Sequence, residues 1–279
     1  EHPSALSFDE SLSAYQYPYE VSRYRFSSQG ESLEMAYMYL APKTLAVGSV
    51  MLLHGKNFNG AYWKETANML HEMGFGVVIP DQIGFGKSSK PIDYQYSFEA
   101  LAQNTKGLLE HLHIDSVHVI GHSMGGKTAM WAACSQPERI QQLLVADIGP
   151  KSYPSHHVHI LEAMKSLALT PPSSRQEAGQ LLEKKGLASG IVQFLLKNLE
   201  RKPDQTLGWK LNLPVLYQSM ESIGTALDPN MSYPGPTLFL RGSKSTYILD
   251  ADLPQILGHF PKAQIDEISE AGHWLHAEN

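Results

Sequence analysis

The sequence has little cysteine, a modest charge and no long apolar run. Its 279 residues include one cysteine, Cys134, which excludes an internal disulfide framework and a zinc site made of thiolates. Lys and Arg number 22, against 28 for Asp and Glu. Without a basic excess to neutralise phosphates, we expect no nucleic-acid partner. No apolar run approaches the ~18 residues that a membrane helix needs, so we also expect no membrane span.

Hydrophobic residues make up 42% of the chain, which is enough to bury a sizeable core. The length fits one large α/β domain or two small ones. No signal peptide is recognisable, so the sequence leaves the cellular compartment open. The composition therefore predicts a soluble globular protein, either an enzyme or a small-molecule binder.

Strands and helices alternate along most of the chain. Residues 1–19 have no clear period and are expected to form an arm laid over the body. Strands are predicted at 20–26, 33–40, 50–53, 76–80, 116–120, 140–146, 237–241 and 263–268, and helices at 61–73, 98–112, 124–135 and 251–260. The central strands are continuously apolar, which is typical of a parallel sheet covered on both faces.

The alternation stops between residues 149 and 236. Helices are predicted there at 157–169, 176–185 and 191–199, with no convincing strand. We therefore predict an α/β fold in which residues 1–148 and 237–279 form a mostly parallel central sheet flanked by helices. A helical cap or lid insertion, residues 149–236, interrupts it. Apolar residues of the insertion, such as Phe194 and Leu195, either pack into its own core or line a pocket.

The motif Gly-His-Ser-Met-Gly at 121–125 matches the pattern G-x-S-x-G. The pattern alone is weak, but here it follows a predicted strand and opens a predicted helix. A turn of this kind holds its serine in a strained conformation between glycines, because a Cβ would collide with the adjoining strand and helix. Ser123 is therefore the candidate nucleophile, and the backbone N–H of Met124 is a candidate donor to an oxyanion.

A serine hydroxyl needs a base, and the base needs an orienting acid. There are thirteen histidines, and His273 is selected because it follows the last predicted strand, where the order Ser…Asp…His places the base. His122 adjoins the nucleophile and is expected to pack behind it. The histidines at 156, 157 and 159 lack carboxylate or thiol support at ligand spacing, so we predict a solvated helix face there. We expect neither a metal nor an organic cofactor.

Two positions are candidates for the acid. The commoner one lies in a G-x-x-D turn after the strand 237–241, but this turn carries Ser245 where the aspartate should be. Asp250 and Asp252 lie further on, and both are expected to be surface positions. The other position is the end of the strand 140–146, where Asp147 stands. An aspartate there is also a possible turn cap. With the commoner position occupied by serine, Asp147 is favoured.

A second oxyanion donor is expected just after His54-Gly55, at the end of the strand 50–53. The backbone N–H of Lys56, or alternatively that of Asn57, would pair with that of Met124. An ordinary loop is the alternative interpretation of this dipeptide.

Gly-Lys-Ser at 86–88 resembles the end of a phosphate-binding loop. The leading glycine of that motif would fall at position 81, which is Asp81, and Pro91 interrupts the helix that should follow. A nucleotide site is therefore not predicted.

Together these residues resemble the α/β-hydrolase superfamily over nearly the whole chain. The motifs that carry the resemblance are His54-Gly55, 81–88, 121–126, Asp147 and 272–274. The segments 121–130, 145–150, 236–240 and 271–277 are similar to a narrower branch of short-acyl esterases and thioesterases, which implies an acid after the sixth strand and so supports Asp147. The first hundred residues, especially 81–91, look more like secreted, epoxide-hydrolase-like members.

The resemblance implies a serine hydrolase that cleaves a small carboxylic ester or thioester as a monomer or homodimer. Ser123, His273 and Asp147 would form the catalytic triad, and the amides of Lys56 and Met124 the oxyanion hole. Dehalogenases and epoxide hydrolases of this fold use an aspartate nucleophile, so Ser123 argues against both. Lactonases, carbon–carbon bond hydrolases, cofactor-free peroxidases and ligand receptors with residual activity stay open as alternatives on the same triad.

Overall fold

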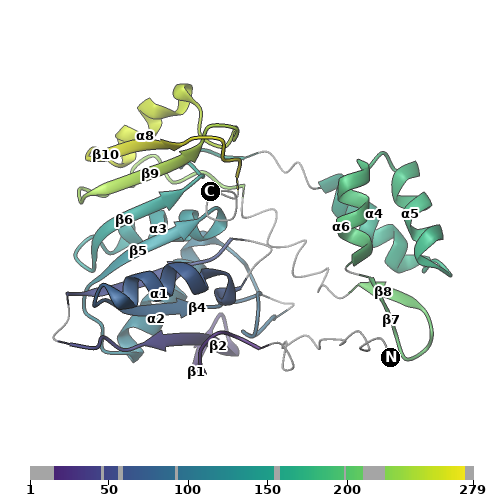
Figure 1. Cartoon of the computed structure of the whole chain (residues 1–279), viewed down its shortest axis with the longest axis horizontal. Helices are drawn as coiled ribbons and strands as arrows, with labels where there is room; N and C mark the ends of the chain where they lie inside the picture. The colour runs from purple at the N-terminus through teal and green to yellow at the C-terminus, as the bar shows by residue number, and fades with distance from the viewer. Residues whose placement is uncertain are drawn as a thin grey trace. The chain divides into compact units, whose positions relative to one another are not determined.

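The computed structural model describes residues 16–44, 47–55, 59–91, 94–153, 158–197, 199–209 and 224–273. The chain divides into two compact units (Figure 1). Residues 17–153 and 222–279 form the first, which we call the core unit. The second comprises residues 1–16 and 154–221, and we call its described segment 158–209 the insertion unit.

The core unit contains a mostly parallel eight-stranded sheet flanked by helices, as the sequence predicts (Figure 1). Two antiparallel pairings, β1 with β2 and β2 with β4, occupy one edge, and all other pairings are parallel. In sheet order the strands are β1 (Val21–Ser28), β2 (Glu31–Leu40), β4 (Gly76–Pro80), β3 (Ser49–Leu53), β5 (Val117–His122), β6 (Ile140–Ala146), β9 (Thr237–Gly242) and β10 (Ala263–Ile268).

The turn between β1 and β2 follows from two residues with positive φ. Gln29 has φ 53° and Gly30 φ 79°, which is the backbone of a two-residue hairpin loop whose twist matches that of the strands. This turn joins the strands predicted at 20–26 and 33–40.

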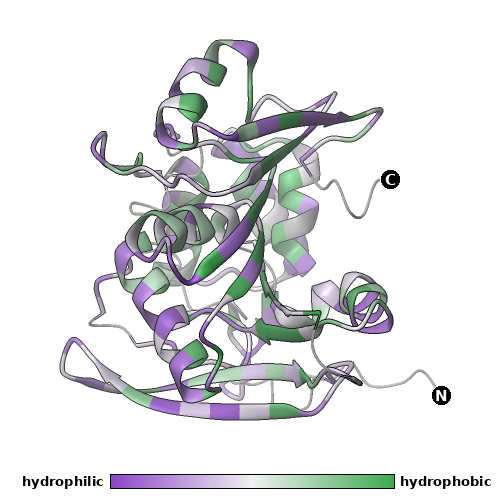
Figure 2. Cartoon of the chain, turned by 90° about the vertical axis from the view of Figure 1, so that its left-hand side faces the viewer, coloured by the Kyte–Doolittle hydropathy of each residue, from purple (hydrophilic) through white to green (hydrophobic). Residues whose placement is uncertain are grey.

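The central strands are buried on both faces. All five residues of β4 are buried, as are the last four of β3. In Figure 2, strands of the sheet carry green stretches that mark hydrophobic residues. Burial on both faces explains their continuous apolar sequence, because helices cover a parallel sheet on either side.

Four helical segments of the core unit lie near the predicted positions. They are α1 (Lys64–Glu72), α2 (Phe98–His111), α3 (Met124–Ser135) and α8 (Leu253–His259). The α-helices predicted at 61–73 and 251–260 are shorter than expected. A separate 3₁₀ turn precedes each of them, Gly60–Trp63 before α1 and Asp250–Asp252 before α8. Asn59 starts the first of these turns by accepting a hydrogen bond from the Ala61 N–H.

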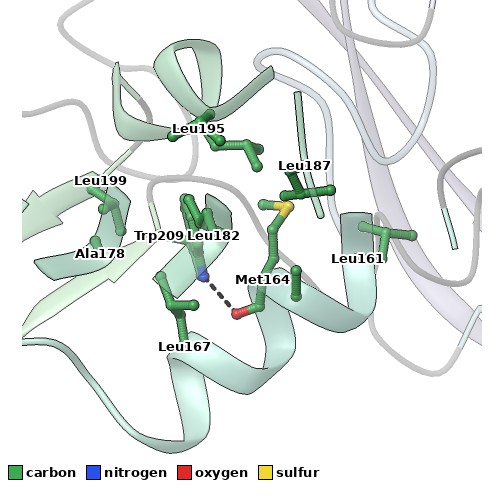
Figure 3. Close-up of a cluster of buried hydrophobic side chains, with 11 residues drawn as sticks. Leu161, Met164, Leu167, Ala178, Leu182, Leu187, Leu195, Leu199 and Trp209 are labelled. Atoms are coloured by element: carbon green, nitrogen blue, oxygen red, sulfur yellow. Dashed lines mark hydrogen bonds between the residues drawn. The ribbon is translucent and has the colours of Figure 1, made fainter. Parts of the chain in front are cut away.

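The insertion unit has a hydrophobic core of its own. Its helices are α4 (Val158–Leu169), α5 (Arg175–Lys184) and α6 (Ser189–Lys197). Leu161, Met164, Leu182 and Leu195 are among the buried side chains that converge in Figure 3, and Trp209 Nε1 donates to the Met164 carbonyl at 2.9 Å. Leu195 thus belongs to this core, and the side chain of Phe194 lies outside the described residues.

The expectation that residues 149–236 contain no strand is wrong. Leu199–Arg201 (β7) and Leu207–Trp209 (β8) form an antiparallel pair, so the helix predicted at 191–199 ends earlier, at Lys197. Each strand has only three residues. Such short strands give no alternation long enough to be recognised in a sequence.

Candidate active site

The turn from β5 to α3 holds Ser123 in a conformation that non-glycine residues rarely adopt. Ser123 has φ 52° and ψ −118°, and α3 begins at the next residue, Met124. The backbone leaves the strand and enters the helix within one residue, which presents the hydroxyl at the carboxyl edge of the sheet. A positive φ outside glycine costs on the order of 1 kcal/mol or more, and surrounding packing must stabilise it.

The glycines of the motif allow this turn to pack closely. A Cβ on Gly121 would lie 2.3 Å from the Gly125 carbonyl oxygen. A Cβ on Gly125 would lie 2.2 Å from the carbonyl oxygen of Leu53 in β3. Both contacts involve backbone, which has no flexible side chain to move, so the chain needs glycine at these two positions.

Ser123, His273 and Asp147 lie in one hydrogen-bonded row. The Nε2 atom of His273 is 3.0 Å from Ser123 Oγ, and its Nδ1 atom is 2.7 Å from Asp147 Oδ2. Since an ionised carboxylate only accepts hydrogen bonds, Nδ1 carries the imidazole proton and Nε2 is left to accept from the serine hydroxyl. Ser123 and Asp147 directly follow β5 and β6, and His273 lies in the segment after β10.

The Asp147 carboxylate is completely buried and accepts hydrogen bonds on both oxygens. The Gly242 N–H donates to Oδ1 at 3.3 Å, and the Ser245 hydroxyl donates to Oδ2 beside His273. Ser245 occupies the turn in which the acid is more commonly found. The structure therefore places a hydrogen-bond donor to Asp147 in that turn, a contact that was not predicted from the sequence.

The alternative acids lie elsewhere. Asp250 Oδ1 is 2.8 Å from the Arg241 guanidinium and its side chain is 84% exposed. Asp252 Oδ2 is 2.7 Å from Lys151 Nζ, and its side chain is only 13% exposed. The expectation that both are surface positions is wrong for Asp252, because this ion pair joins η2 (Asp250–Asp252) to the segment after Asp147.

His273 lies between two aromatic side chains. Tyr247 stacks on the imidazole with ring centroids 3.7 Å apart and an interplanar angle of 13°. His122, which is fully buried, has its ring centroid 5.0 Å from that of His273, and its Nε2 donates to the His273 carbonyl at 2.7 Å. Burial lowers the pKa of His122 to about 4, so it is neutral near pH 7.

Tyr247 is itself held by hydrogen bonds to its backbone. Its N–H donates to Ser245 Oγ at 3.2 Å, and its carbonyl accepts from the Tyr153 hydroxyl at 2.7 Å. The sequence gives no signal for these contacts, because Tyr153 and Tyr247 belong to segments that only the fold brings together.

The start of the predicted oxyanion loop is fixed through His54. The Gln82 N–H donates to His54 Nε2 at 3.0 Å, so the ring proton is on Nδ1, which donates to the Gly55 carbonyl at 2.7 Å. Burial lowers the pKa of His54, which keeps it neutral. The Gln82 side chain also accepts from Thr128 Oγ1 of α3 at 2.9 Å. Lys56 and Asn57, the two candidate donors, lie outside the described residues.

The loop that resembles a phosphate-binding motif encloses a carboxylate. The Lys87 N–H donates to Asp81 Oδ2 at 2.8 Å, and the Ser88 hydroxyl donates to the Asp81 carbonyl at 2.6 Å. Donors that would face a phosphate are thus used within the protein. Among the predicted helix-face histidines, His159 is exposed, and the other two lie outside the described residues.

The chain belongs to the α/β-hydrolase family. Residues 48–178 match the family model described as alpha/beta hydrolase fold. A solved structure of a marine microorganism esterase is 35% identical with a TM-score of 0.72, and the match covers 89% of this chain and 95% of that one.

Two curated relatives define the class of enzyme further. The sn-1-specific diacylglycerol lipase ABHD11 of Mus musculus is 36% identical over 242 residues, covering 82% of this chain and 76% of that protein. Esterase YbfF of Escherichia coli strain K12 is 32% identical over 189 residues, covering 67% and 72%. By these relationships the chain is an enzyme, a carboxylic ester hydrolase of the esterase and lipase kind. Within its described residues, no helix has the length and apolar character needed to cross a bilayer.

Proposed function

We propose that this carboxylic ester hydrolase cleaves a small ester or thioester through a triad of Ser123, His273 and Asp147 and an acyl-enzyme intermediate. The observation that carries the proposal is the row of two hydrogen bonds at His273, 3.0 Å to Ser123 Oγ and 2.7 Å to Asp147 Oδ2. Both distances lie within the range expected for a nucleophile, its base and an orienting acid.

In the acylation step, Ser123 Oγ attacks the carbonyl carbon while its proton moves to His273 Nε2. Asp147 keeps the imidazole in the required tautomer and stabilises the imidazolium that forms. Collapse of the tetrahedral intermediate transfers the proton from His273 to the leaving alcohol or thiol. Water then attacks the acyl-enzyme by the same route, which releases the acid and restores the serine hydroxyl.

The negative charge on the carbonyl oxygen needs donors already in position. Met124 begins α3, so its N–H has the orientation and the helix-terminal location suited to this role. The N–H of Lys56 is the second donor in the proposal. It follows the His54-Gly55 segment that Gln82 holds against α3.

Residues 149–236 are proposed to form a cap that selects the acyl chain, as loops on a conserved scaffold commonly do. The motifs at 121–130 and 271–277, similar to those of short-acyl esterases and thioesterases, support a small acyl group. The first hundred residues resemble epoxide-hydrolase-like members, yet Ser123 stands at the nucleophile position. The kinship with enzymes named esterase and lipase favours hydrolysis over a receptor function.

Turnover of aryl esters from acetate to palmitate, with acyl-thioesters alongside, tests the proposal. Ser123→Ala should lower kcat by about 10³-fold or more while the fold stays intact, because triad members act as a unit. A fluorophosphonate should label Ser123 and no other serine. An active alanine variant, labelling at another serine, or a single turnover followed by stalling would contradict the proposal.

A further inference from the structure

Lys127 is a lysine of α3 whose side chain is completely buried. Its Nζ donates to the carbonyl oxygens of Lys151 at 2.6 Å and Thr225 at 2.5 Å. It also lies 5.6 Å from the ring centroid of Phe98 and 5.3 Å from that of Tyr153. Within the described part of the chain no carboxylate forms an ion pair with it.

The two carbonyls belong to the segments by which the chain leaves and re-enters the core unit. The core unit ends at Tyr153 and resumes at Ser222. We call Gly149–Tyr153 and Gly224–Leu227 the crossing segments. They pair with each other, since the Tyr153 N–H donates to the Gly224 carbonyl and the Leu227 N–H donates to the Pro150 carbonyl, both at 2.9 Å.

This pairing leaves little space. A Cβ on Gly224 would lie 2.5 Å from the Tyr153 carbonyl oxygen. Lys127 contacts one carbonyl on each crossing segment, so a single side chain links both segments to the helix that begins just after the nucleophile.

Burying an amine costs more free energy than burying an apolar side chain of the same size. Burial lowers the pKa of Lys127 to about 7, and an apolar side chain of similar length would avoid that penalty. A lysine supplies at least two N–H donors in either protonation state, whereas an apolar residue would leave both carbonyls without this partner. The donors, rather than the volume, are what the position requires.

We propose that Lys127 is a positioning residue that holds both crossing segments on the nucleophile helix and thereby sets the acyl-chain selectivity of the enzyme. The selectivity part rests on the proposed function of residues 149–236 as a cap. The Lys127 N–H donates to the Ser123 carbonyl at 3.1 Å, a backbone bond that a side-chain substitution retains. Since the Lys127 amine bonds to the crossing segments and not to the triad side chains, its removal should change which esters are accepted more than it changes the chemistry.

The test compares Lys127→Met with wild type and with Lys106→Met, a control on α2 whose lysine forms a partly exposed ion pair with Glu110. The acyl-length profile of kcat/KM is measured for aryl esters. Hydrogen exchange is followed by mass spectrometry in peptides that contain the Tyr153 and Leu227 amides. Fluorophosphonate labelling of Ser123 reports separately whether the triad is competent.

For Lys127→Met we expect the fluorophosphonate to label Ser123 completely, and kcat for the shortest ester to stay within about threefold of wild type. The ratio of kcat/KM for long esters to kcat/KM for short esters should change by about tenfold. That is the size expected when buried carbonyls lose their hydrogen-bond donor. Exchange at Tyr153 and Leu227 should be at least about tenfold faster, with Lys106→Met unchanged. Absent labelling in wild type would count against the triad and not against Lys127.

Gly224→Ala perturbs the crossing segments directly, at Gly224. It serves as a second test if Lys127→Met fails to fold. Its Cβ pushes against the Tyr153 carbonyl, so it should reproduce the shift in selectivity and the faster exchange. Faster exchange with an unchanged acyl-length profile would overturn the selectivity role. Unchanged exchange in a folded Lys127→Met variant would overturn the whole proposal.

Discussion

Ser245 donates its hydroxyl hydrogen to the same carboxylate oxygen of Asp147 that accepts from His273 Nδ1. The turn that more commonly supplies the acid in this fold thus supplies a donor to an acid on the neighbouring strand. This places the two possible acid positions within one hydrogen bond of each other. The choice between them is therefore open to experiment.

Ser245→Ala should lower kcat by about tenfold, because a hydrogen bond to a charged group contributes about 1.5–3 kcal/mol. The buried carboxylate would lose one donor and keep those from Gly242 and His273. The measurement is kcat and KM for a short aryl ester. A change in KM alone would argue that Ser245 contacts substrate rather than supporting the acid.

Moving the carboxylate from position 147 to position 245 tests this relationship more directly. Asp147→Asn combined with Ser245→Asp should recover at least about tenfold of the kcat lost in Asp147→Asn alone, since the new carboxylate can accept from His273 Nδ1 and from the new amide. The matched control combines Asp147→Asn with Ser245→Asn, which has the same shape without the charge. Equal kcat in the two double variants would rule out a transferable acid.

Asp147→Asn alone should lower kcat by roughly 10⁴-fold, because an amide favours the wrong imidazole tautomer. Asp250→Asn is the control, since the Asp250 side chain is 84% exposed and pairs with Arg241, and the stability of this variant should change by less than about 0.5 kcal/mol. Asp252→Asn is a poorer control, because that carboxylate pairs with Lys151. Comparable losses at 147 and 250 would contradict the assignment of the acid.

Tyr247 should support catalysis through its ring and not through its hydroxyl. The ring lies flat against the imidazole at 3.7 Å, where it can stabilise the imidazolium by a cation–π interaction of about 0.5–2 kcal/mol. Tyr247→Phe should keep kcat within about twofold, and Tyr247→Leu should lower it by roughly three- to thirtyfold with little change in KM. Equal losses in both variants would instead indicate the hydroxyl.

The free energy of unfolding should depend on pH, because the pKa of Lys127 differs between the folded and the unfolded chain. Its pKa falls from the ordinary 10.5 to about 7 on folding, so between these values the unfolded chain binds a proton that the folded chain does not. Stability from this group therefore rises as pH increases through that window. Below about pH 7 both states carry the charge, and the cost of burying it is fully present.

The unfolding free energy of wild type minus that of Lys127→Met should consequently increase from pH 6 to pH 9. The slope is at most about 1.4 kcal/mol per pH unit, because one proton is involved. Urea unfolding of both proteins at several pH values measures it, and titrations common to both cancel in the difference. A flat difference would mean that Lys127 titrates normally in the folded protein.

The sequence predicted the sheet and the three residues that lie in the hydrogen-bonded row, because each follows a predicted strand. Parallel strands bring such positions to one edge of a sheet. The contacts of Ser245, Tyr247 and Lys127 were not predictable in this way. Some of them join residues about a hundred positions apart, as with Lys127 and Thr225, and they depend on the angle at which each turn leaves its strand. Asp252 was misjudged for the same reason.

Ser123 and Asp147 share a backbone feature, a φ of 52° at a residue that is not glycine. Glycine would occupy both positions with less backbone strain, so the fold loses some stability at two residues of the proposed triad. Selection for resistance to heat alone would therefore favour removing this backbone strain, and with it two residues of the proposed triad. A search for robust forms of this hydrolase has to require turnover at every round, since thermal stability and activity are opposed at these two backbone positions.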